Sequence, residues 1–195
     1  GRLIQHHPVF DALWYNEDNN TVYFDDKPLT EHAVTGVLML IQRSFSMPQC
    51  TRRPVEAALH HTARIYKSRH PWREYLQSLK WDGTERLHNW LEEYCNAKPT
   101  DMCLEGGLKW MVGSVARTFE PGAKVDYMLV TSGPQGVGKS SLPNLLFTQP
   151  NVRSITNHLR DTDVFTAMHR SKCANWEELA AMSNYELDHM KTMIT

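Results

Sequence analysis

The sequence lacks the features that mark several large classes of protein. It contains no apolar run near the roughly 20 residues that a helix needs to cross a bilayer. Residues 1–7 lack the basic-then-apolar order of a signal peptide. The four cysteines, at positions 50, 95, 103 and 173, include no C-x-x-C pair, so neither a disulfide framework nor a zinc site is indicated. We therefore expect a cytoplasmic protein with no membrane partner.

An excess of charge of either sign is also missing. The chain has 21 Lys and Arg residues against 22 Asp and Glu residues, a formal net charge of −1. Proteins that bind nucleic acid through a whole face carry a strongly basic balance, so any DNA contact here would be local. With 41% hydrophobic residues in 195, the chain has the composition of a globular protein and room for one domain, or a small domain joined to part of a larger one.

The N-terminal third has the pattern of a small α+β unit, residues 1–69. The aromatic and β-branched runs Leu13–Asn16 and Thr21–Phe24 flank a turn-forming cluster and predict a β-hairpin. Thr30 and Thr51 then stand where N-caps of two amphipathic helices would stand. A hairpin with two helices is compatible with a winged-helix-like fold.

Residues 70–120 predict a helical segment that packs on the remainder of the chain. Thr84 is expected to cap a helix, and a further helix is expected over about residues 103–118, ending at the turn Glu120-Pro121-Gly122. The apolar stripe of the first of these helices consists of Leu87, Trp90, Leu91 and Tyr94.

Residues 121–195 contain the motif with the most specific chemistry. The apolar run 127–132 predicts a strand, and it leads directly into Gly-Pro-Gln-Gly-Val-Gly-Lys-Ser at 133–140, which matches G-x-x-x-x-G-K-[ST]. In such a loop the glycines let successive N–H groups converge on a phosphate, and the following helix adds its positive end. Pro143 removes one backbone donor early in that helix.

The motif predicts a binding site for ATP with magnesium. Lys139 would reach the β- and γ-phosphates as the catalytic cation, and the Ser140 hydroxyl would be the protein's magnesium ligand. The residues expected to contact the nucleotide are Gly133, Pro134, Gln135, Gly136, Val137, Gly138, Lys139, Ser140 and Ser141.

A nucleotide hydrolase of this kind also needs a second strand that ends in carboxylates. The candidate is the weakly apolar run 172–179, in which Glu177 and Glu178 are adjacent. Paired glutamates are equally typical of a solvated first turn of a helix, where the dipole favours them. From the residues alone, both interpretations stay open.

Several stretches together resemble the virulence-associated protein E family of phage and mobile-element ATPases, which is related to phage primase-helicases. The resemblance covers about residue 70 to the end. It rests on His-Pro-Trp-Arg-Glu-Tyr-Leu at 70–76, Leu-Lys-Trp-Asp-Gly-Thr-Glu-Arg-Leu at 79–87, Gly-Ser-Val-Ala-Arg at 113–117, the approach 121–130 and the loop 133–140. Neither periodicity nor capping requires the Trp-Asp-Gly-Thr stretch, which makes it specific.

The resemblance implies an α/β P-loop NTPase core of the additional-strand type, like superfamily 3 helicases, which assemble into rings on DNA. Aligned with the family's second acidic motif, the first glutamate falls on Asn175 and the second on Glu178. Glu178 is thus the expected catalytic carboxylate, with Glu177 in reserve, and the amide of Asn175 predicts weakened magnesium binding or turnover. Family members continue past Thr195, so we expect a truncated core over 121–195 that binds ATP without hydrolysing it efficiently.

The leading hypothesis is the ATP-binding module of a helicase or primase-helicase of phage or mobile-element replication. A P-loop nucleotide or small-molecule kinase is the alternative enzyme, although no arginine-rich lid follows the loop. A non-hydrolysing DNA-binding or regulatory fragment is the third hypothesis. It would contact DNA phosphates through Arg52-Arg53 and through the basic run 67–70, although both clusters are also typical of a solvated face.

Overall fold

The computed structural model describes residues 2–148, 151–155, 168, 171–176, 188 and 192. Contacts divide the chain into an N-terminal unit, Gly1–Glu74, and a C-terminal unit, Tyr75–Thr195. The division falls inside helix α4, Pro71–Ser78. The three-part division predicted from the sequence, at residues 70 and 121, stays a prediction.

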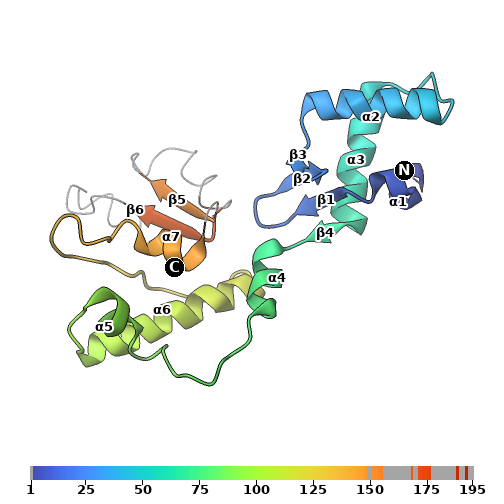
Figure 1. The fold of residues 1–195 in the computed structure, drawn as a ribbon. Coiled ribbons are helices and arrows are strands. Elements are labelled where there is room, and N and C mark those ends of the chain that lie inside the picture. Colours follow the sequence, from blue (N-terminus) through green and yellow to red (C-terminus); the bar gives the residue numbers. More distant parts are fainter. Residues whose placement is uncertain are drawn as a thin grey trace. The chain divides into compact units, whose positions relative to one another are not determined.

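The N-terminal unit is built on a four-stranded mixed sheet of order β3-β2-β1-β4 (Figure 1). β1 and β2 pair antiparallel as the predicted hairpin, and β4 pairs parallel with β1. Asp25 and Asp26, both with φ +54°, form the tight turn between β2 and β3, because a two-residue hairpin turn needs left-handed backbone. The strands are β1, Leu13–Asn16; β2, Thr21–Phe24; β3, Lys27–Pro28; and β4, Ser68–Arg69.

Helix α3 packs against β1 and against α1 and α2 (Figure 1). The two predicted N-caps are confirmed as helix starts, but they differ in chemistry. The Thr30 hydroxyl accepts a hydrogen bond from the Ala33 N–H at 3.3 Å, whereas the Thr51 side chain makes no capping bond. The helices are α1, Arg2–His6; the 3-10 turn η1, Pro8–Phe10; α2, Glu31–Ser44; and α3, Arg52–Tyr66.

The interior of this unit is a single apolar cluster. Phe10, Leu13 and Leu59 are fully buried, and they bring together η1, β1 and α3. Alternate residues of β1 and β2 supply the face toward the helices, as the two-residue period of a strand requires. The α+β character predicted for residues 1–69 is what the structure has, and the winged-helix-like assignment stays a prediction.

A buried carboxylate joins the β1–β2 turn to the start of α4. The Asp18 side chain is 7% exposed. Its Oδ2 accepts a hydrogen bond from the Trp72 N–H at 2.8 Å, and its Oδ1 lies 2.9 Å from His70 Nδ1. Asp18 therefore satisfies a first-turn amide of α4, a helix 54 residues further along the chain.

The C-terminal unit contains three further helices and a two-stranded sheet among its described residues. α6 covers the helix predicted over about residues 103–118 and ends at the predicted turn. Its N-cap is Thr100, whose hydroxyl accepts a hydrogen bond from the Cys103 N–H at 3.3 Å. The rings of Trp90 and Trp110 stack with centroids 6.0 Å apart, and Phe147 meets Trp110 edge-on, so α5, α6 and α7 share one aromatic contact. The helices are α5, Trp90–Cys95; α6, Asp101–Phe119; and α7, Leu142–Phe147.

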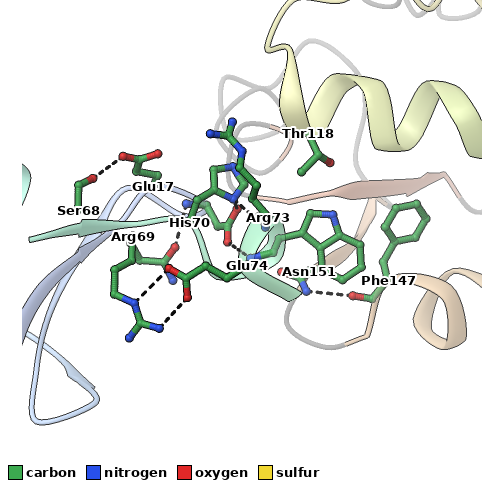
Figure 2. A network of polar contacts seen from close by, with 12 residues as sticks. Glu17, Ser68, Arg69, His70, Arg73, Glu74, Thr118, Phe147 and Asn151 are labelled. Carbon is green, nitrogen blue, oxygen red and sulfur yellow. Dashed lines mark hydrogen bonds and ion pairs between the residues drawn. The ribbon is translucent and has the colours of Figure 1, made fainter. Parts of the chain in front are cut away.

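β5, Val152–Ile155, and β6, Cys173–Trp176, pair in parallel, and α7 packs against both (Figure 1). The Asn151 carbonyl accepts from the Lys172 and Cys173 N–H groups, at 2.7 and 3.1 Å, and so sets the register at the start of the pair. The Asn151 side chain in turn donates to the Phe147 carbonyl at 2.9 Å, which fixes the end of α7 to β5 (Figure 2). The strand predicted within residues 172–179 is confirmed over 173–176.

Two local predictions are wrong. Residues 127–132 form no strand; they run without strand hydrogen bonds beside α6. Thr84 caps no helix, because α5 begins only at Trp90. The Thr84 N–H instead donates to the Asp82 carboxylate at 3.0 Å in a turn.

Candidate functional site

The glycine-rich loop is an exposed turn that leads into α7. Every residue from 133 to 138 is exposed, and so are Ser140 and Ser141. Gly136 has φ +83° and Gly138 φ +88°, in the left-handed region that side-chain-bearing residues rarely adopt. The motif therefore has glycine at the two loop positions where the backbone requires it.

Lys139 folds back over this loop. Its ammonium group donates to the Gly133 carbonyl at 2.9 Å and to the Pro134 carbonyl at 2.6 Å. The positive charge thus lies at the mouth of the loop, on carbonyls that an arriving anion could replace as its partners. The structure brings Lys139 and the first two loop residues together, and the assignment of this loop to a phosphate stays a prediction.

The loop connects to α7 by a short turn. The Ser141 and Leu142 N–H groups both donate to the Gly138 carbonyl, at 3.0 and 3.1 Å. α7 begins at Leu142, with Pro143 in its first turn, where a missing donor costs no intrahelical bond. Ser140, whose hydroxyl is the predicted magnesium ligand, is exposed.

The approach to the loop is held by side-chain bonds with α6, and no strand of the described residues pairs with it. The Arg117 guanidinium donates to the Ala123 carbonyl at 3.1 Å and to the Val125 carbonyl at 2.9 Å. The Tyr127 hydroxyl donates to the Lys109 carbonyl at 2.7 Å. The two carbonyls that Arg117 binds precede the predicted strand, and Tyr127 is bonded through its side chain, so these bonds connect the approach to α6 without forming a ladder.

The Trp-Asp-Gly-Thr stretch forms a built turn. The Asp82 carboxylate accepts from the Thr84 N–H at 3.0 Å and binds the Arg86 guanidinium through both oxygens, at 3.0 and 2.8 Å. Hydrogen bonding to Arg86 holds the pKa of Asp82 well below its usual range. Gly83, at φ +87°, allows the reversal, and the Trp81 indole N–H donates to the Thr84 carbonyl at 3.2 Å.

This turn forms one wall of a largely apolar pocket of about 930 Å³. Tyr94 of α5 and Met111 of α6 contribute to the lining, as do Leu142, Leu145 and Leu146 of α7. In the sequence, the Trp-Asp-Gly-Thr stretch was a specific feature of the family resemblance, but no role could be inferred for it. The pocket could not be found from sequence, because its lining comes from four separate segments.

The acidic candidates fall largely outside the structure's described part. Glu177 and Glu178 lie beyond the described residues, immediately after β6. Asn175 is described, and it pairs in register with Ser154 of β5. Burial raises the pKa of the neighbouring Cys173 thiol to about 11, so this strand is in a poorly solvated environment.

Residues of both basic clusters considered for DNA contact have polar partners within the N-terminal unit. Arg52 lies 3.2 Å from Glu31, and the Lys67 ammonium donates to the Phe10 carbonyl at 2.7 Å. Arg69 binds both carboxylate oxygens of Glu74, at 3.2 and 2.6 Å (Figure 2). A phosphate would have to compete with these partners.

Residues 76–195 match the model of the virulence-associated protein E-like domain. Because this match covers more than half of the chain, the protein belongs to the virulence-associated protein E-like family, as its motifs predicted. A comparison with curated proteins gives no match. Among the described residues, no helix is both long and apolar enough to cross a membrane.

Proposed function

We propose that this chain is the ATP-binding module of a helicase or primase-helicase that serves phage or mobile-element replication. The observation that carries the proposal is the loop 133–141, whose two left-handed glycines and inward-folded lysine suit a phosphate group. Membership of the virulence-associated protein E-like family supports the assignment to phage or mobile elements. A kinase is less well supported, because no feature of the described residues resembles a lid.

The residues that would hold ATP are those of the exposed loop. Its backbone N–H groups and the Lys139 ammonium would bind the phosphates, and the Ser140 hydroxyl would join the magnesium ion that accompanies them. The bound metal ion would supply charge neutralisation for the transferred phosphate. DNA and further copies of the chain are proposed as partners of the complete protein.

Thermal unfolding with and without magnesium-ATP tests the proposal. A ligand that binds only the folded state, at about 100 times its Kd, stabilises that state by about 2.7 kcal/mol. We expect magnesium-ATP to raise the Tm of the wild type by several degrees and to leave Lys139→Ala unshifted. Lys98→Ala, at an exposed lysine outside the loop, is the matched control and should respond like the wild type.

A shift of equal size in Lys139→Ala and in Lys98→Ala would remove the assignment of the nucleotide to this loop. The absence of any shift in the wild type, at millimolar magnesium-ATP, would remove nucleotide binding itself.

Turnover is a separate part of the proposal. We expect slow ATP hydrolysis, because an amide stands at Asn175 where the family's acidic motif has a carboxylate. Glu178→Gln should abolish the remaining hydrolysis while ATP still raises the Tm. Hydrolysis by Glu178→Gln at the wild-type rate would exclude Glu178 as the catalytic carboxylate, and the same assay on Glu177→Gln then tests the reserve candidate.

A further inference from the structure

We propose that the apolar pocket of the C-terminal unit takes the nucleobase of the bound nucleotide, with the Trp81 indole stacked on the base. The inference rests on the proposed function, because the loop 133–141 would hold the phosphates of the same molecule. It assigns the Trp-Asp-Gly-Thr turn a role in base recognition.

Trp81 is unusual in being both exposed and fixed. Its side chain is 77% exposed, yet its indole N–H is tied to the Thr84 carbonyl at 3.2 Å. Thr84 is in turn held by Asp82, which is clamped by Arg86. An aromatic ring that stays exposed to water contributes little burial to the stability of the fold. A ring whose orientation is already fixed loses little entropy when a flat ligand stacks on it.

The size of the pocket and the residues that line it are compatible with a bound nucleobase. Its volume of about 930 Å³ lies within the range of small-molecule sites, roughly 300–1,000 Å³. Leu142, Leu145 and Leu146 supply an apolar surface, and Leu145 is 77% exposed. Glu85 and His88 also line the pocket and bring hydrogen-bonding groups for the edge of a base.

The pocket adjoins the glycine-rich loop, which favours a nucleotide as its occupant. Leu142 lines the pocket, and its N–H donates to the Gly138 carbonyl at 3.1 Å. The pocket wall therefore begins at the residue that follows the phosphate loop. A molecule with a triphosphate at one end and a flat base at the other can use both features. An apolar peptide has no phosphate for the loop, and the acyl chain of a lipid has no flat ring to stack on the Trp81 indole.

Equilibrium titration with two ligands separates the base from the phosphates. Magnesium-tripolyphosphate reports on the loop alone, and magnesium-ATP reports on the loop and the pocket. We expect the wild type to bind ATP more tightly than tripolyphosphate. Trp81→Ala should weaken ATP binding about tenfold, the effect of losing one stacked base, and leave tripolyphosphate unchanged.

Two further variants make the test specific. Trp81→Phe keeps a stacking ring and should retain most of the ATP affinity, whereas Asp82→Ala keeps the indole but frees the turn and should give an intermediate loss. Tyr66→Ala removes an aromatic side chain that is 55% exposed in the N-terminal unit and should change neither affinity. Circular dichroism of each variant checks that the fold is retained.

The outcomes distinguish the inference from the function on which it rests. If the wild type binds tripolyphosphate and ATP equally, or Trp81→Ala loses affinity for both equally, the base pocket is wrong while the phosphate loop stands. If the wild type binds neither ligand, the proposed function and the inference fall together.

Indole fluorescence identifies competing occupants. Adenosine, compared between wild type and Trp81→Ala, should quench the emission of Trp81. Quenching by oligodeoxythymidylate that adenosine cannot displace would assign the pocket to single-stranded DNA and overturn the inference. So would self-association that Trp81→Ala abolishes without any change in ATP affinity.

Discussion

The buried cluster of the N-terminal unit contrasts with the apolar pocket of the C-terminal unit. In the N-terminal unit Phe10, Leu13 and Leu59 are completely buried in one cluster. In the C-terminal unit Trp81 and Leu145 are each 77% exposed, and they line the same pocket. Burial of apolar surface is the main source of folding free energy, so the first arrangement stabilises a fold and the second leaves apolar surface available to a ligand.

A similar contrast holds for the polar networks. Asp18 is buried and connects segments far apart in the N-terminal sequence. Asp82 is exposed and orders only a few residues around itself. Substitutions in the first unit should therefore change stability, whereas substitutions in the exposed turn and loop of the second should change ligand binding. Four predictions test that difference.

The largest effect is expected at Leu59. Leu59→Ala leaves a cavity in the cluster, and such changes typically destabilise by about 2–5 kcal/mol. Ile65, on the same helix and 62% exposed, supplies the control, because Ile65→Ala should stay within about 0.5 kcal/mol. Urea denaturation followed by circular dichroism measures both. Equal effects would contradict the description of this core.

Asp18→Ala should come next, at about 1–3 kcal/mol, because the substitution withdraws an acceptor from a buried backbone amide. Asp18→Asn keeps one side-chain oxygen and should lose less. Hydrogen exchange at the Trp72 amide is the more local measurement. Unchanged protection in Asp18→Ala would show that the carboxylate does not hold the start of α4.

One N-cap in each unit allows a matched comparison. Thr30→Ala and Thr100→Ala remove the same 3.3 Å hydrogen bond from α2 and from α6, and each should destabilise its own helix by about 1 kcal/mol. Thr51→Ala removes a residue that makes no capping bond and should cost less. A loss at Thr51 as large as that at Thr30 would contradict the cap assignments. Thermal unfolding of the three variants provides the comparison.

The smallest expected effect is a change in Trp81 fluorescence at low pH, when Asp82 becomes protonated. Arg86 lowers the pKa of Asp82 in the folded protein, below its ordinary value of 3.8. The contribution of this ion pair is therefore fully present above that value and is lost as the pH falls toward the lower, folded pKa. The emission of Trp81, read as the difference between wild type and Trp81→Phe, should stay constant down to about pH 4 and change only below it. A transition near pH 6 would point to another group.

Local patterns in the sequence determined much of the fold correctly. The hairpin, the helix starts at Thr30 and Thr51 and the strand before Glu177 were predictable because each depends on neighbouring residues. The strand predicted at 127–132 failed because an apolar run needs a pairing partner. Here Arg117 and Tyr127 fix the approach to the loop through side-chain bonds with α6 instead.

The candidate site was predictable only in part, because some of its features depend on neighbouring residues and others on contacts between distant segments. Gly136, Gly138 and Lys139 form one contiguous motif, and the structure gives the two glycines the backbone they were expected to need. The cap predicted at Thr84 was wrong because this stretch forms a turn, in which the Asp82 carboxylate binds the Thr84 N–H and the Arg86 guanidinium. The pocket beside that turn is a tertiary feature. The sequence indicated the Trp-Asp-Gly-Thr stretch and the apolar stripe that includes Leu87, Trp90 and Tyr94, but not that they line one pocket together with α6 and α7.

The central claim is that residues 133–141 bind the phosphates of ATP, and calorimetric titration of the protein with magnesium-ATP tests it most directly. We predict one site in the wild type, the same affinity in Lys98→Ala, and loss of measurable binding in Lys139→Ala. Binding of equal affinity in Lys139→Ala, or no heat of binding in a folded wild-type protein, would contradict the account.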